Sequence, residues 1–147
     1  MKPYRVLITG SRGWADRLAV EDTLTAAGAL AIALGQRLVI VHGACPTGAD
    51  AIADEWANWH RERGDRPFTV ERHPAQGHPT EDFGPWPAAG PRRNAFMVRL
   101  GADVCLAFIG PCTSPRCRKP HPHPSHGASG CADLAEQAGI PTRRRTA

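Results

Sequence analysis

The chain has 147 residues, the length of one ordinary domain and enough to bury a core. Its formal net charge is +4, but Arg143, Arg144 and Arg145 near the carboxyl terminus carry three of these charges, so the rest has a net charge of +1. This composition argues against a nucleic-acid partner, which needs a clustered basic face, and no segment has the apolar length required to span a membrane.

The cysteine content and the amino terminus predict a cytoplasmic protein. Five cysteines are an odd number, and in a reducing compartment they are better explained as thiols or metal ligands than as a disulfide framework. The first residues lead directly into an apolar strand pattern and show no signal peptide.

Strands and helices are expected to alternate from the start of the chain. Apolar runs at 4–9 and 37–42 predict buried strands. An Ala- and Leu-rich helix is expected between them, with Asp16 as its amino-terminal cap and Gly35 as its carboxyl-terminal cap. A second helix follows Gly48, because Ala49, Ile52, Ala53, Trp56 and Ala57 recur at helical spacing, and it ends at Gly64.

The second half continues the alternation but contains two irregular segments. The expected order is a strand at 68–72, a Pro- and Gly-rich loop at 73–91, a helix at 92–100, a strand at 104–109, a second loop at 110–128, a helix at 129–138 and an edge strand at 141–144. We therefore expect a single α/β domain over 1–147, with a Rossmann-like, doubly wound, mainly parallel five-stranded sheet in a three-layer sandwich. Small domains of this type are often homodimers, so we also expect a dimer.

The most informative features are two strands that each run into a loop of small residues ahead of a helix. The first loop contains Gly10, Ser11, Arg12 and Trp14. A guanidinium beside small residues can approach a phosphate and donate two hydrogen bonds to it, which we favour over a surface ion pair for Arg12. Trp14 either stacks on a nucleobase or packs beneath the loop.

The second loop spans 43–50. The N–H groups of Thr47 and Gly48 open a helix, and with Gly43 they predict an anion site. Asp50 either stabilises the helix dipole or accepts hydrogen bonds from ribose hydroxyls. Cys45 is most simply a small loop residue.

Two further helix starts are expected at the same edge of the sheet. Adjacent arginines on a helix point in different directions, so at most one of Arg92 and Arg93 should face the crevice. We take Arg93 as that residue, which the family resemblance described below also supports, with Asn94 fixing the loop or contacting the ligand. Met97 is assigned to the core. Ser129 and Gly130 open the last helix and complete the predicted ligand site.

The loop at 110–128 is rich in cysteine and histidine, and two interpretations stay open: a tetrahedral zinc site that orders the loop, or a solvated loop without a metal. The candidate ligands are Cys112, Cys117, His121, His123, His126 and Cys131. We take Cys112, Cys117 and His126 as three of them, with the fourth left open among His121, His123 and Cys131.

Gly10-Ser11-Arg12, the loop at 43–50, Arg93-Asn94 and Ser129-Gly130 together resemble the SLOG superfamily. The similarity is closest to its YspA/YpsA-related branch, with Lonely Guy phosphoribohydrolases and the DNA-processing protein DprA as more distant relatives, and it extends over 5–140. The resemblance implies a Rossmann-like domain that binds a nucleotide or nucleotide-derived ligand, with a role in signalling or in conflict with mobile elements.

The resemblance to Lonely Guy enzymes is incomplete. These enzymes use an arginine near the start of the third helix, which Arg93 matches, and a glutamate in a Pro-Gly-Gly-x-Gly-Thr-x-x-Glu motif. The matching segment at 126–134 places Leu134 at the glutamate position and Asp133 one residue earlier. The resemblance therefore does not carry over the hydrolytic mechanism.

Three functions remain open at this point. The leading one is binding of a nucleotide-type small molecule by a sensor or sequestering module. The alternative is hydrolysis of an N-glycosidic or phosphoester bond in such a ligand, for which Arg93, Asp50 and Asp133 are catalytic candidates and Glu81 and Asp82 offer further carboxylates. The third is DprA-like binding of single-stranded DNA, against which the near-neutral charge counts.

Overall fold

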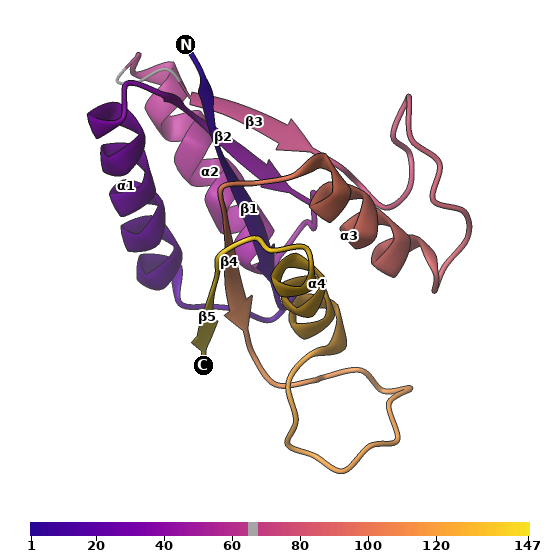
Figure 1. Ribbon diagram of the computed structural model, residues 1–147. Helices are drawn as coiled ribbons and strands as arrows, with labels where there is room; N and C mark the ends of the chain where they lie inside the picture. Colours follow the sequence, from indigo (N-terminus) through magenta and orange to yellow (C-terminus); the bar gives the residue numbers. More distant parts are fainter. Residues whose placement is uncertain (65–67) are drawn as a thin grey trace.

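The computed structural model describes residues 1–64 and 68–147 (Figure 1). Its strands are β1 (Pro3–Gly10), β2 (Arg37–His42), β3 (Phe68–Arg72), β4 (Val104–Ile109) and β5 (Thr142–Thr146). Its helices are α1 (Arg17–Ala33), α2 (Gly48–Glu62), α3 (Ala89–Leu100) and α4 (His126–Gln137). The strands form one sheet in the order β3-β2-β1-β4-β5, and every pairing is parallel. The predicted doubly wound α/β fold is confirmed.

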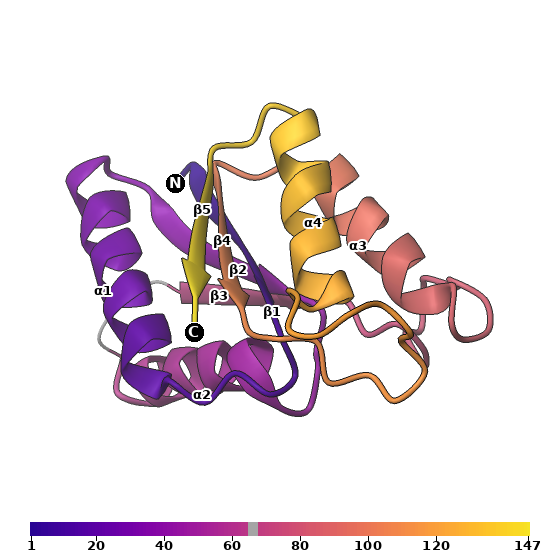
Figure 2. The same cartoon turned by 90° about the horizontal axis from the view of Figure 1, so that it is seen from below.

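The two faces of the sheet are covered by different pairs of helices. Alternate side chains of a strand point to opposite faces, so Val6 and Ile8 pack into the core that includes α1 and α2, while Leu7 packs into the core that includes α3 and α4. Figure 2 shows the two helix layers on opposite sides of the sheet. No helix in the described ranges combines the length and the apolar character needed to cross a membrane.

The ends of the first two helices agree with the sequence prediction. Asp16 caps α1, and its Oδ1 accepts a hydrogen bond from the N–H of Ala19 at 3.1 Å. Gly35 and Gly64 follow α1 and α2 with φ values of 67° and 66°, the left-handed conformation that glycine adopts readily. The predicted bounds of β2, β3 and β4 are those observed.

The starts of α3 and α4 lie three residues before the predicted ones, at Ala89 and His126. The residue before α3 is Ala88, which has no side chain for capping, so the sequence carries no start signal there. Ser125 precedes α4 but makes no capping hydrogen bond. The irregular segments are correspondingly shorter, and β5 begins and ends later than expected, at Thr142–Thr146.

The strand order places a crevice at the carboxyl edge of the sheet. The chain leaves β1 for the α1 and α2 side, whereas it leaves the neighbouring β4 for the α3 and α4 side. Loops that diverge from adjacent parallel strands leave room for a ligand between them. The candidate residues of β1 and β2 lie at this edge.

Candidate functional site

The loops after β1 and β4 are joined by hydrogen bonds at the crevice. The Ser11 hydroxyl lies 2.5 Å from that of Ser125, and it accepts a hydrogen bond from the N–H of Gly110 at 2.8 Å. The N–H of Ser11 donates to the carbonyl of Phe108 at 2.9 Å. Ser11 is buried, so its polar groups are used to hold the two loops together.

The loop after β1 also packs against the start of α2. Gly48 has φ of 76°, and a Cβ at this position would collide with the carbonyl oxygen of Ser11. A Cβ on Gly10 would collide with the side chain of Ala49. These glycines therefore allow a close approach between the two loops. Thr47, which precedes α2, is exposed and makes no capping hydrogen bond with its side chain.

Asp50 is a buried carboxylate in the first turn of α2. Its Oδ2 accepts hydrogen bonds from the N–H groups of Gly43 at 3.1 Å and Cys45 at 3.3 Å. Its Oδ1 has no hydrogen-bond partner among the described residues. Burial raises the pKa of Asp50, against the opposing effects of His42, the Cys45 N–H and Arg93. A buried carboxylate oxygen without a donor is costly, and a ligand hydroxyl can supply that donor.

Arg93 connects three segments at the carboxyl edge. Its Nη1 donates to the carbonyls of Gly43 at 2.5 Å and His73 at 3.1 Å, and its Nε donates to Asn94 at 2.8 Å. Asn94 in turn donates to the carbonyl of Gly127 at 3.5 Å. Burial lowers the pKa of Arg93, and the nearby Asp50 opposes this effect. Arg93 and Asn94 thus tie together the ends of β2 and β3 and the start of α4.

Arg92 and Arg93 point in different directions, as expected for neighbours on a helix. Arg92 donates to the carbonyl of Phe83 at 3.3 Å and not to the segments that Arg93 contacts. Met97 is 2% exposed and lies in the core. These placements follow from the helical spacing of neighbouring side chains.

Arg12 and Trp14 have different environments. Trp14 is buried, its ring lies 5.5 Å from that of Phe108, and its Nε1 donates to the carbonyl of Asp16 at 2.9 Å. The structure therefore favours packing beneath the loop over base stacking for Trp14. Arg12 is exposed, and its guanidinium carbon lies 5.5 Å from the centre of the Trp86 ring.

Sequence reasoning missed His42, which shapes the loop after β2. Its Nδ1 accepts a hydrogen bond from the N–H of Ala44 at 2.9 Å, so its Nε2 carries the proton and donates to Asp54 at 2.7 Å. Ala44 has φ of 56°, a conformation that the His42 contact helps to hold. A histidine at the end of an otherwise apolar strand is the signal that could have revealed this role.

The predicted residues of α4 lie further from its start than expected. The helix begins at His126, so Ser129 and Gly130 lie within it, and the Ser129 hydroxyl donates to the carbonyl of Ser125 at 2.6 Å. Ser125 and Gly127 occupy the start of the helix instead. Asp133 is exposed and pairs with Arg144 of β5 at 2.6 Å.

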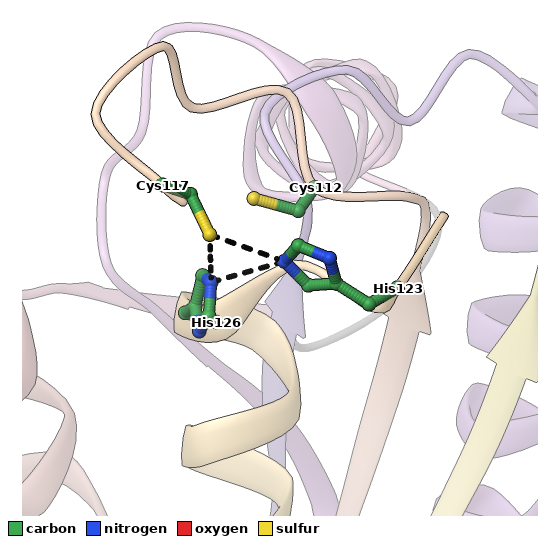
Figure 3. Close-up of side chains that lie close together, drawn as sticks. All are labelled: Cys112, Cys117, His123 and His126. Atoms are coloured by element: carbon green, nitrogen blue, oxygen red, sulfur yellow. Dashed lines mark hydrogen bonds between the residues drawn. The ribbon is translucent and has the colours of Figure 1, made fainter. Parts of the chain in front are cut away.

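The loop between β4 and α4 brings four potential metal ligands together. Cys112, Cys117, His123 and His126 offer ligand atoms that all lie within 4.8 Å of one another, and the four side chains point toward a common centre in Figure 3. The Cys117 sulfur lies 3.3 Å from Nε2 of His123 and 3.2 Å from Nε2 of His126. Tetrahedral zinc bonded to sulfur and nitrogen requires separations of about 3.3–3.8 Å between ligand atoms. This cluster could hold a metal ion.

The environment of His123 supports ligation through Nε2. Its Nδ1 lies 2.9 Å from the carbonyl of Pro120, which can only accept a hydrogen bond, so Nδ1 carries the proton. The lone pair on Nε2 then faces the cluster. Metal-bound histidines usually have such a second hydrogen bond, which fixes the ring.

Of the three residues that the sequence left open as a fourth ligand, His123 is the one that lies in this four-residue cluster. His121 is exposed and lies against His123, with 4.6 Å between ring centres, but it is not part of the four-residue cluster. Cys131 is buried in the core beside α3 and α4, and burial raises the pKa of its thiol to about 11. It is outside the cluster because it lies within α4, more than one turn after His126.

A second group, His73, His78 and Glu81, lies in the segment after β3. His73 Nδ1 is 2.9 Å from Glu81, but Nδ1 of His78 accepts a hydrogen bond from the N–H of Thr80 at 3.1 Å. These three side chains therefore form a hydrogen-bonded network that stabilises the loop after β3. Asp82 accepts a hydrogen bond from the N–H of Gly84 at 2.8 Å.

A hollow of about 600 Å³ lies outside the crevice. It is formed by the 80–84 segment and α3, and Arg92, Phe96 and Arg99 are among its lining residues. The hydrogen bonds of Asp50 and Arg93 lie elsewhere, with Gly43, Cys45 and His73 in the segments that follow β2 and β3.

The fold is that of a Rossmann-like α/β protein. Its parallel sheet has a crevice at the carboxyl edge, where loops of small residues lead into helices. The family model described as "YspA, cpYpsA-related SLOG family" matches residues 4–77. The "Gene 61 protein" of Mycobacterium phage D29 is 44% identical over 142 residues, which cover 93% of this chain and 92% of that protein. The chain belongs to the YspA, cpYpsA-related SLOG family.

Among solved structures, the comparison finds a universal stress protein from Archaeoglobus fulgidus. The two chains are 18% identical with a TM-score of 0.46, and the match covers 98% of each.

Proposed function

We propose that the crevice binds a nucleotide or a nucleotide-derived ligand, as a sensor or sequestering module. The observation that carries this proposal is Asp50, whose buried Oδ1 has no partner among the described residues and which is electrostatically coupled to Arg93. A ribose hydroxyl would donate to this oxygen, and carboxylates commonly bind ribose in this way. Membership of the SLOG family supports the same class of ligand.

Arg12 is the cation available for the phosphate. Its side chain is exposed at the crevice, whereas Nη1 of Arg93 already donates to two carbonyls. The open start of α2, where Thr47 makes no capping bond with its side chain, would add backbone N–H donors and a favourable helix dipole. Arg93 then acts by holding the loop after β2 and by its charge near Asp50.

Binding is favoured over hydrolysis because two of the candidate carboxylates are already engaged in ion pairs. Asp133 pairs with Arg144, and Glu81 contacts His73, so both side chains already have partners. Leu134 occupies the position at which Lonely Guy enzymes have their glutamate.

Calorimetric titration with nucleoside mono-, di- and triphosphates and ADP-ribose tests the proposal. We expect Arg12→Ala to weaken binding about tenfold or more without lowering stability, because a charged hydrogen bond is lost. Arg63→Ala is the matched control, since Arg63 is also exposed and lies over a tryptophan, Trp59. Failure of all these ligands to bind the wild-type protein would refute the proposal.

We also propose that the cluster of Cys112, Cys117, His123 and His126 binds zinc. Two sulfur and two nitrogen ligands form a closed tetrahedral set, which is typical of a structural site. The loop between β4 and α4 has few buried residues, so metal binding would supply order that a core does not. Reduced thiols suit a cytoplasmic location.

Native mass spectrometry, with the denatured mass as reference, tests the zinc proposal. The wild-type protein should carry one zinc ion per chain, and Cys117→Ser should lose it. Cys45→Ser is the control, because Cys45 is a half-buried cysteine outside the cluster. A wild-type protein that stays metal-free after exposure to zinc would contradict the proposal.

A further inference from the structure

The segment between β3 and α3 brings an exposed tryptophan to the carboxyl edge of the sheet. Trp86 is 49% exposed, and its six-membered ring packs against Gly90 in the first turn of α3, where an added Cβ would lie 3.0 Å from Cζ3. The absence of a side chain at Gly90 lets the edge of the ring, at Cζ3 and Cη2, approach the helix start closely. The position of Trp86 is therefore fixed although half of its surface faces solvent.

Trp86 also contacts the loop after β1. The Arg12 guanidinium carbon lies over the ring, 5.5 Å from its centre. A cation above an aromatic ring is held electrostatically, while its N–H groups remain able to donate hydrogen bonds. An aromatic surface and a phosphate-binding cation thus lie side by side, although they come from segments more than 70 residues apart in the sequence.

The other tryptophans of the chain do not offer such a surface to the crevice. Trp14 is 6% exposed and Trp56 is 8% exposed. Trp59 is 50% exposed but lies near the end of α2, which runs away from the carboxyl edge. Among the described residues, Trp86 is the exposed tryptophan at the edge where Arg12 and Asp50 lie.

We propose that Trp86 is the platform on which the base of a bound nucleotide stacks, with Arg12 beside it donating to the phosphate. This inference rests on the proposed nucleotide function and adds a base-binding residue to it. Stacking on a tryptophan tolerates every base, because each has a π-face. Specificity for one base would then come from polar contacts elsewhere.

The test is calorimetric titration of the full chain with AMP, GMP, CMP and UMP and with ribose 5-phosphate, which has the same sugar and phosphate but no base. The wild-type protein should bind its best nucleotide at least about fivefold more tightly than ribose 5-phosphate. Trp86→Ala should remove this difference and leave the affinity for ribose 5-phosphate unchanged. Trp86→Phe should retain most of it, and Trp59→Ala should behave as the wild type.

The outcomes separate this inference from the function on which it rests. Equal nucleotide affinities in the wild type and Trp86→Ala would overturn the stacking role while leaving nucleotide binding intact. Wild-type affinity that is the same for ribose 5-phosphate and every nucleotide would also overturn it. A wild-type protein that binds neither these compounds nor the nucleoside di- and triphosphates and ADP-ribose would refute both proposals.

Discussion

Asp50 is the buried carboxylate on which the proposed ligand site rests. Its Oδ2 is fully engaged by the N–H groups of Gly43 and Cys45, whereas Oδ1 has no partner among the described residues. The first turn of a helix also favours a negative charge at this position. The two roles that the sequence presented as alternatives are thus compatible: Oδ2 holds the loop after β2, and Oδ1 is the oxygen that we propose accepts a ligand hydroxyl.

The pH dependence of stability tests the environment of Asp50. Because burial raises its pKa, the folded protein retains a proton that the unfolded chain loses near its usual pKa of about 3.9. The unfolding free energy of the wild type should therefore fall, relative to that of Asp50→Asn, as pH rises from about 4 through the raised pKa. Urea unfolding of both proteins between pH 4 and 7 measures this difference in unfolding free energy. The contributions of the other titrating groups are common to both proteins and largely cancel. A difference that is constant or changes in the opposite direction would contradict it.

Some residue roles were predictable and others were not. Helical spacing predicted that Arg92 and Arg93 point in different directions, and they donate to different segments, Phe83 and Gly43. It also placed Met97 in the core, which is confirmed. The sequence did not reveal that Trp14 packs on Phe108, because that contact joins positions 94 residues apart and depends on the strand order. For the same reason, the contact between Arg12 and Trp86 could not be predicted from either loop alone.

At the scale of elements, the close packing of the β1–α1 loop on the start of α2 determines the shape of the crevice. Gly48 makes this contact possible, because it has φ of 76° and no Cβ to collide with the Ser11 carbonyl. The sequence identified Gly48 as the start of a helix but could not show what lay opposite it. The starts of α3 and α4 were also missed, since Ala88 cannot cap a helix and Ser125 instead contacts Ser11.

Gly48→Ala tests this packing. The substitution combines an unfavourable backbone conformation with a backbone collision, so we expect the free energy of unfolding to fall by about 2 kcal/mol or more. Gly13→Ala is the control, because Gly13 lies in the same loop, has no positive φ and would have no neighbour within 4 Å of its Cβ. Its effect should stay within about 0.5 kcal/mol. Equal unfolding free energies of the two variants in urea would show that the close approach of Gly48 to the Ser11 carbonyl is not required for stability.

At the scale of the whole molecule, the strand order places the separate motifs together. The alternating pattern predicted the doubly wound fold and several strand bounds, since buried parallel strands appear as continuous apolar runs. The order β3-β2-β1-β4-β5 then sends neighbouring loops to opposite faces. The Cys/His loop lies beside this crevice, since Ser125, which immediately precedes His126, contacts Ser11. The cysteine and histidine content of this loop indicated a cluster of such side chains, but that His123 and not His121 lies in it follows only from the folded loop.

The most direct test of the central claim is hydrogen–deuterium exchange of the wild-type protein with and without a saturating nucleotide that binds in calorimetry. Binding at the carboxyl edge should slow amide exchange in peptides that cover Gly10–Arg12, the 43–50 loop and the start of α3. Peptides from the far end of α2, around Trp59, should be unaffected. Protection confined to the 80–84 segment and the outer residues of α3 would place the ligand in the separate hollow instead and contradict the account.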